Sequence, residues 1–568
     1  MKSLDPSVIE YVRSQSFSDR YAAYLRNTLL ELAAINTAPS HDLPATARNE
    51  KNLFDHIERE IREISDGAVV CQRVPIDPAI ADDGAYAPPG YAADREGQVP
   101  SVEALYADRS NMIVTVPGEQ SDAPLAAILH AHVDVVSPWY APRSAGDRVF
   151  GRGVCDNKAH LAILIAQIKL AFEMAGELGI KPPRGFVLHL PIDEEIGGNG
   201  SLALVRDPRF AGLPVLLLEP TDLVPYSAHR GAVYYRCKLS AGENPNHTAL
   251  ELFPFVVIEL EKLGRTIQQE TKGPLFSPNQ IQTNHGVLGP YGRHPGNVCD
   301  HVAVELIVES NANPQRIGMK LIELMEEAVS NYIRLYGDLV RQIDPATGKP
   351  KLRQHFDLQI RPTARTQNFL LEVWGRAGHM GAVAQCDNAI TKAAFLLGSL
   401  LRMAPKFPQV QARGVLPGTD VDNRQIVLEG GQGFSPSHHL ADIQERMRQA
   451  AVKGVQKSCA LRGRPFDPAM VEMTFDRLHS EPYVSSPDIA PMEAIKSAFQ
   501  ALGESWPTPA AWSSSCDARI YHRAGHPVAI FGAGQLEVCH SDMEYIDIPQ
   551  MQRALAVTTL ATFALATS

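Results

Sequence analysis

The segment Leu125-Ala-Ala-Ile-Leu-His-Ala-His-Val-Asp134 joins an apolar run directly to polar side chains. The run 125–129 has the length and composition of a buried strand. His132 and Asp134 follow it two residues apart, so an extended backbone would place both side chains on one face. Taken alone, such a pair is more often a polar strand end than a site. The rest of the chain decides between the two interpretations.

Strand-like and helical patterns alternate around this segment. Apolar runs predict strands, and helical spacing predicts helices. The strands are expected at 111–116, 185–190, 214–218 and 528–531, and the helices at 160–175, 492–502 and 549–566. Alternation of this kind is typical of an α/β domain with a largely parallel sheet.

The middle of the chain has a different texture. From about residue 230, two successive segments each alternate strands and helices, with helices expected at 314–336 and 389–403. We therefore predict an α/β domain formed by 1–228 and 483–568. An inserted domain of two tandem α+β modules, 229–482, would interrupt it.

Acidic and imidazole side chains recur where the predicted strands of the α/β domain end. Each has an ordinary interpretation when taken alone: a helix cap for Asp156, an acidic turn for a Glu-Glu pair, a structural role for a lone His. Together they lie where open α/β sheets build their sites. These residues are His132 and Asp134, Asp156 in Gly151-Arg-Gly-Val-Cys-Asp-Asn-Lys158, Glu194-Glu195, Glu219 and His540.

At this point the sequence resembles the zinc-dependent amidohydrolase and peptidase family of glutamate carboxypeptidase, acetylornithine deacetylase, succinyl-diaminopimelate desuccinylase and bacterial dipeptidases. The resemblance implies a co-catalytic zinc-peptidase-like catalytic domain with an inserted, enlarged α+β lid. It also implies the following ligand set: His132 and Glu219 on one metal, Glu195 and His540 on the other, and Asp156 bridging both. By the same resemblance Glu194 is the general base, Asp134 orients His132, and the peptide bond Asp156–Asn157 is cis.

Two further motifs resemble lid segments of that family. Gly375-Arg-Ala-Gly-His-Met-Gly381, with Asp387-Asn-Ala-Ile390 behind it, implies that His379 steadies the substrate or its oxyanion. Gly296-Asn-Val298 implies that Asn297 approaches the substrate. In dimeric relatives the lid His can come from the neighbouring subunit, whereas an enlarged lid imitates a dimer within one chain. We therefore expect His379 to act in its own chain, which is compatible with a monomer; His247 matches the lid pattern poorly.

One departure from the family pattern concerns the residues that would contact a substrate anion. Many peptidases of the family carry an Arg in the strand after the Asn motif, where this chain has Glu305 and Glu309. Arg519, in Ser515-Cys-Asp-Ala-Arg519, and Arg230, in His229-Arg-Gly231, are candidate contacts for a substrate anion. A surface ion pair is an equally good interpretation of either Arg.

These motifs predict a hydrolase that cleaves an amide bond in a small substrate such as a dipeptide or an N-acyl amino acid. A metal-bound hydroxide would attack, with Glu194 as its base. Two divalent ions are expected, zinc by preference, with manganese or cobalt as alternatives. A serine or cysteine hydrolase is a weaker interpretation, because no Gly-x-Ser-x-Gly elbow occurs. The alternative from another class is a binding or scaffold protein on the same fold that has lost its metals.

Amino-acid composition indicates which partners and which cellular compartment to expect. The 568 residues carry a net charge of −11, which leaves no basic surplus for nucleic acid. The start of the chain lacks the apolar core of a secretory signal, and the apolar helix 161–175 is short and interrupted by charges, so no membrane segment is expected. The eight cysteines form no Cys-x-x-Cys pair and fit a reducing compartment. We predict a cytoplasmic protein.

Overall fold

The chain forms two compact units. The computed structural model describes residues 4–92, 99–120, 122–243, 247–309, 312–343, 347, 349–351, 354–362, 367–403, 411–417, 423–475 and 479–568. Met1–Gly231 and Leu478–Ser568 make up the first unit, and Ala232–Arg477 make up the second. The sequence-based boundaries of the insertion were 229 and 482.

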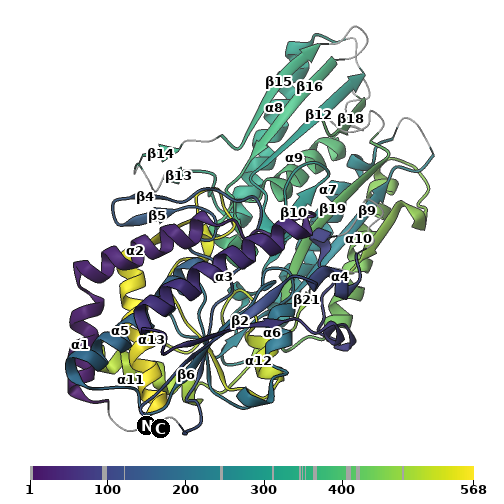
Figure 1. The fold of residues 1–568 in the computed structure, drawn as a ribbon. Helices are drawn as coiled ribbons and strands as arrows, with labels where there is room; N and C mark the ends of the chain where they lie inside the picture. Colours follow the sequence, from purple (N-terminus) through teal and green to yellow (C-terminus); the bar gives the residue numbers. More distant parts are fainter. Residues whose placement is uncertain are drawn as a thin grey trace. The chain divides into compact units, whose positions relative to one another are not determined.

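A six-stranded sheet forms the centre of the first unit (Figure 1). Its strands lie in the order β1 (Val70–Pro75), β2 (Ser110–Val116), β6 (Phe186–Leu190), β3 (Ile128–His130), β7 (Val215–Leu217) and β23 (Val528–Ile530). The last four strands run parallel, whereas β1 and β2 pair antiparallel. The carboxyl ends of β6, β3, β7 and β23 therefore meet at one edge of the sheet, as the predicted site requires.

Helices supply most of the remaining core of this unit. Helix α5 is apolar nearly all round and buried along most of its length, which is the pattern of a helix enclosed by other elements. It packs against α2, α3 and α13. The helices are α1 (Pro6–Ser16), α2 (Asp19–Ala34), α3 (Leu43–Ser65), α4 (Val102–Tyr106), α5 (Lys158–Leu178), α6 (Asn199–Leu204), α11 (Ala490–Leu502), α12 (Ala518–Arg523) and α13 (Ile548–Ala566). Among the described residues, no helix combines the length and the apolar character needed to cross a membrane.

Two small sheets complete the first unit. One consists of β4 (Arg143–Ala145), β5 (Arg148–Phe150) and β24 (Tyr545–Asp547), and the other of β8 (Ala228–His229) and β22 (Tyr483–Val484). The pairing of β5 with β24 connects the loop before α5 to the segment that follows His540.

Among the described residues, the second unit contains two larger antiparallel sheets and four α-helices, α7 (Phe253–Glu270), α8 (Pro314–Tyr336), α9 (Ala389–Met403) and α10 (Leu440–Leu461). The order of one sheet is β10 (Thr283–Leu288), β19 (Gln425–Phe434), β9 (Gly231–Ser240) and β20 (Val471–Thr474). The order of the other is β15 (Phe356–Pro362), β16 (Gln367–Trp374), β12 (His301–Glu309) and β18 (Gln411–Val415). The first sheet thus combines early and late strands of the insertion. All four strands of the second sheet come between β10 and β19 in the chain, so this sheet is nested within the first, whereas the sequence predicts two modules in tandem.

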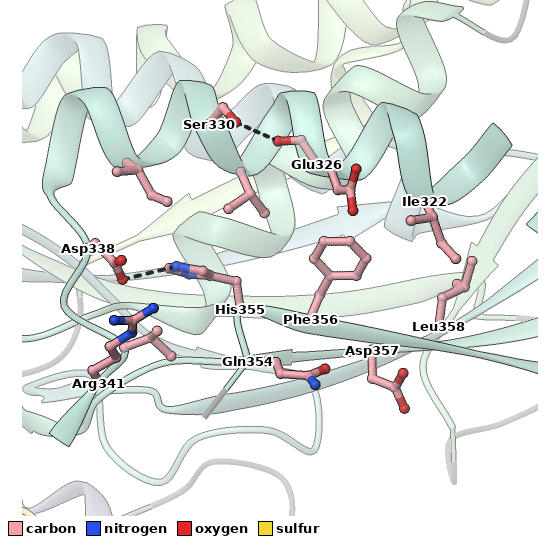
Figure 2. A pocket seen from close by; sticks show the side chains of 13 residues that line it. Ile322, Glu326, Ser330, Asp338, Arg341, Gln354, His355, Phe356, Asp357 and Leu358 are labelled. Atoms are coloured by element: carbon pink, nitrogen blue, oxygen red, sulfur yellow. Dashed lines mark hydrogen bonds and ion pairs between the residues drawn. The ribbon is translucent and has the colours of Figure 1, made fainter. Parts of the chain in front are cut away.

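Two short strand pairs and a groove complete the description of this unit. β11 (Asn297–Val298) pairs with β17 (Gly378–His379), and β13 (Gln342–Ile343) pairs with β14 (Pro350–Lys351). A groove of about 610 Å³ runs along α8 and β15. Figure 2 shows His355 and Asp338 in contact at one end of it and Phe356 and Ile322 farther along. None of the predicted site residues lines this groove.

Candidate active site

Three of the predicted metal ligands form one cluster in the first unit. Ligand atoms of His132, Asp156 and Glu195 all lie within 4.8 Å of one another. His132 follows β3, Asp156 precedes α5, and Glu195 follows β6. The parallel strands end at the same edge of the sheet, so residues far apart in sequence become neighbours.

The Asp156 carboxylate lies between two imidazoles. Its Oδ1 is 3.1 Å from Nε2 of His132, and its Oδ2 is 3.4 Å from Nε2 of His540. Nε2 of His540 is also 3.1 Å from Oε2 of Glu195. One carboxylate that faces two different imidazoles is the arrangement expected of a group that bridges two cations. The peptide bond Asp156–Asn157 is cis, so that expectation is confirmed.

Asp134 contacts both His132 and the loop that carries the paired glutamates. Nδ1 of His132 lies 3.0 Å from the Asp134 carbonyl oxygen and 3.4 Å from its Oδ1. The Asp134 carboxylate accepts hydrogen bonds of 3.1 Å from the backbone N–H of Glu194 and from that of Glu195. These contacts hold the ring with Nε2 toward Asp156, as a ligating imidazole needs.

Acidic groups outnumber cationic ones in the cluster, and their pKa values reflect this. Burial raises the pKa of Glu194 well above its ordinary range, and the charges of Asp517, Glu219 and Glu195 raise it further. Burial likewise raises the pKa of Glu219 and of Glu195. The pKa of Asp156 is well below its ordinary range because its hydrogen bonds with the two imidazoles outweigh the effect of burial.

The donor set fits divalent cations. Glu219 is 3% exposed, and among the described residues its Oε1 has no hydrogen-bond partner. A buried carboxylate oxygen without a partner is costly unless a cation compensates it. Mixed imidazole and carboxylate donors suit zinc, and also manganese or cobalt.

Two acids of the site escaped the sequence-based prediction. The carboxylate of Glu544 accepts hydrogen bonds from the backbone N–H of Cys155, 3.0 Å, and of Asp156, 3.2 Å, and it pairs with the buried Arg152. Asp517 is fully buried, 3.6 Å from Nε2 of His130. Asp517 belongs to the motif that suggested Arg519, and Glu544 follows His540 by four residues, so an acid close to each predicted residue was the available signal.

The two arginines proposed as anion contacts bond to acceptors of the chain itself. Arg519 donates to the Ser480 hydroxyl, 2.7 Å, and to the Gly197 carbonyl oxygen, 2.9 Å. Arg230 is 1% exposed and donates to the carbonyl oxygens of Ser513 and Gly231. Contact of either group with a substrate stays a prediction.

The two lid motifs meet within the second unit. Asn297 and His379 are directly opposite each other in the β11–β17 pair. Nδ1 of His379 accepts a hydrogen bond of 2.8 Å from the backbone N–H of Gly381. Asn297 is 8% exposed, and among the described residues its Oδ1 has no hydrogen-bond partner. His247 lies elsewhere in this unit, with Nδ1 3.3 Å from Oε2 of Glu251.

The fold and this cluster define an α/β protein with a candidate metal centre at one edge of its central sheet. The chain belongs to Peptidase family M20/M25/M40, whose model matches residues 128–563. The family predicted from the sequence and the α/β fold with its insertion are thereby confirmed.

Solved structures and curated relatives agree with this assignment. The match to human carnosine dipeptidase 1 covers 99% of this chain and 98% of that chain, with a TM-score of 0.55 and 13% sequence identity. The match to the dipeptidase Dug1p of Saccharomyces cerevisiae has the same coverage, with a TM-score of 0.55 and 11% sequence identity. At these identities the likeness shows the fold alone.

The curated relatives match over shorter stretches. A probable carboxypeptidase of Aspergillus terreus is 28% identical over 221 residues, 36% of this chain and 48% of that protein. Acetylornithine deacetylase of Myxococcus xanthus is 25% identical over 278 residues, 47% of this chain and 68% of that protein. The chain thus spans about half the length of the first relative it matches.

Proposed function

We propose that this protein is a two-metal hydrolase that cleaves the amide bond of a small substrate such as a dipeptide or an N-acyl amino acid. One observation carries the proposal: the Asp156 carboxylate lies between the imidazoles of His132 and His540, with Oε2 of Glu194 3.9 Å from Nε2 of His132. The names of the relatives, which include dipeptidases and a deacetylase, favour the same bond type.

The predicted ligands divide into two sets that share Asp156. His132 and Glu219 would complete one set, and Glu195 and His540 the other. When bound, two divalent cations would supply Lewis-acid polarisation of the substrate carbonyl and of the attacking water. Zinc is our first choice, with manganese and cobalt as alternatives.

Glu194 would move the proton. It takes a proton from the attacking water and returns it to the leaving amine, so that the amide C–N bond breaks and the acid and the amine leave. A carboxyl group beside the predicted metal ligands is suited to this task, because it can hold the proton between the two transfers. Asp134 keeps the backbone of Glu194 in place through its hydrogen bond.

The remaining predicted residues would act on the substrate itself. We propose that His379 steadies the oxyanion and that Asn297 contacts the substrate beside it. Their direct pairing in β11–β17 supports a shared role. Arg519 and Arg230 are the candidate contacts for a substrate carboxylate.

Product analysis tests the proposal. Metal-loaded protein is incubated with dipeptides, N-acyl amino acids and aryl amides, and the products are identified by mass spectrometry. We expect cleavage by the wild type, loss of at least about 100-fold in Glu194→Gln, and full activity in Glu119→Gln, which alters an exposed glutamate. A protein that binds no metal and cleaves none of these compounds would instead support the binding-protein alternative.

A further inference from the structure

A buried ionic cluster lies directly behind the loop of the paired glutamates. The guanidinium of Arg109 contacts the carboxylate of Glu50 through Nε, 2.9 Å, and Nη2, 2.6 Å. The same guanidinium donates to both carboxylate oxygens of Asp193, with 3.2 Å from Nη1 to Oδ2. The three side chains are at most 2% exposed. We call Glu50, Arg109 and Asp193 the arginine clamp.

The clamp holds the residue that precedes the proposed general base. Asp193 has a φ of 63°, in the left-handed region that a non-glycine residue rarely adopts. Besides Arg109, the hydroxyl of Tyr106 donates to Oδ2 of Asp193 at 2.9 Å, and the backbone N–H of Gly198 donates to its carbonyl oxygen at 2.7 Å. Such a backbone conformation persists only when surrounding contacts enforce it.

The ionic composition of the clamp argues for a positional role. Two buried carboxyl groups share one guanidinium in this cluster. Burying ions is an inefficient way to stabilise a fold, because desolvation offsets most of the attraction. What the bidentate contacts provide is a fixed geometry.

The opposite side of the same loop is held independently. The Asp134 carboxylate accepts the backbone N–H groups of Glu194 and Glu195. The loop is thus fixed from one side by Asp134 and from the other by Arg109 through the Asp193 side chain. Loss of the clamp alone should therefore shift the loop without releasing it.

We propose that the arginine clamp positions the segment 193–195, so that Glu194 reaches the attacking water and Glu195 reaches its metal. Glu50, Arg109 and Asp193 are positioning residues; none of them needs to touch the substrate. The inference rests on the proposed hydrolase function for its kinetic consequence, but the placement of Glu195 can be measured without catalysis.

Three variants test the clamp. Asp193→Asn removes the carboxylate that Arg109 contacts beside the loop. Arg109→Lys keeps a cation but cannot make the bidentate contacts. Glu50→Gln removes the carboxylate of the clamp that lies farthest from the site. Glu259→Gln is the matched control, because Glu259 is a 5% exposed carboxylate bound by lysines in the second unit. Each protein is measured for kcat and KM and, when loaded with cobalt, for its visible absorption spectrum.

We expect Asp193→Asn to lower kcat by about 10- to 100-fold with a KM change of less than about threefold. Its cobalt spectrum should change because Glu195 moves. Arg109→Lys should retain more kcat than Asp193→Asn, and Glu50→Gln should show the smallest loss. The control should match the wild type in both measurements.

Unchanged kcat and an unchanged cobalt spectrum in Asp193→Asn and in Glu50→Gln would overturn the inference, as would a loss of thermal stability alone. If Asp193→Asn does not fold, Glu50→Gln decides by the same criteria. If the wild type cleaves no compound, the proposed function fails, and the cobalt spectra still decide whether the clamp sets the position of Glu195.

Discussion

Single side chains in this site act as much on the backbone as on the reaction. Asp134 and Glu544 each accept hydrogen bonds from two consecutive N–H groups of a loop that carries predicted ligands. An ionised acceptor on two adjacent peptide groups fixes their orientation. The backbone that carries the predicted ligand side chains is therefore fixed. This is important because a metal ion requires its ligands at defined positions.

Neutral buried histidines make the stability of the first unit sensitive to acid. His189, on β6, is fully buried, with Nδ1 2.9 Å from the Tyr521 hydroxyl, and burial lowers its pKa from 6.5 to about 3. Between these values the unfolded chain binds a proton at this residue and the folded chain does not. The contribution of His189 to stability is therefore present above pH 6.5 and is lost as the pH falls.

This effect can be isolated with His189→Asn, which does not titrate. Urea unfolding gives the free energy of unfolding of wild type and variant at pH 7.5 and at pH 5.5. The advantage of the wild type should shrink by about 1.4 kcal/mol at the lower pH, one pKa unit of differential protonation. An equal difference at both pH values would show that folding does not lower the pKa of His189.

At the scale of elements, the turn between the paired glutamates and α6 depends on a glycine. Gly198 has a φ of 77°, and a Cβ placed on it would lie 2.1 Å from Oδ1 of Asp517 and 2.5 Å from Cδ1 of Ile520. The left-handed backbone and the lack of space both require glycine here. The N–H of Gly198 also bonds to Asp193, so the turn is continuous with the arginine clamp.

Gly198→Ala should therefore destabilise the protein by two separate effects. The matched control is Gly503→Ala, at a φ of 75° with no atom within 4 Å of the added Cβ. We expect about 1 kcal/mol for the control from backbone strain alone. The overlap with Asp517 should add a further 1–3 kcal/mol, roughly, in Gly198→Ala. Thermal unfolding of the two variants side by side measures the difference, and equal melting temperatures would contradict the steric argument.

The elements differ in how well the sequence predicts them. Helices α8 and α9 begin and end where their helical spacing does, and the apolar runs match β2, β6 and β23 within a few residues. Strand β1 was missed, because the polar Gln72 and Arg73 interrupt its apolar pattern. The nested sheets of the second unit were missed for another reason. Pairing such as that of β10 with β19 joins segments more than a hundred residues apart, and local patterns carry no record of a partner.

The same limit applies to the candidate site. His132, Asp156 and Glu195 were predictable because each follows a recognisable strand or loop motif. Glu544 was not predictable, because it accepts a hydrogen bond from the backbone N–H of Asp156, which lies 388 residues away in the sequence. Glu50 lies on α3 and Arg109 lies in the loop directly before β2, and neither belongs to a recognisable motif. Residues that position a site are often distant in sequence from the residues that they contact. Only the folded structure therefore identifies them.

At the scale of the whole molecule, the predicted machinery is divided between two units. The predicted metal ligands and Glu194 belong to the first unit, and Asn297 and His379 belong to the second. The family model spans residues 128–563 and therefore includes both. We propose that His379 acts in its own chain rather than in a second copy, because the sequence predicts an enlarged insertion.

Mixing two inactive variants distinguishes these arrangements. Glu194→Gln lacks the base and His379→Ala lacks the lid imidazole, which should lower kcat by about 100-fold or more. If His379 acts in its own chain, no molecule in a co-expressed mixture has both groups at one site. The activity should then equal the average of the two variants. If His379 is supplied by a partner, random pairing of equal amounts gives half mixed dimers, each with one intact site. The mixture would then recover about one quarter of wild-type activity, and action within one chain would be ruled out.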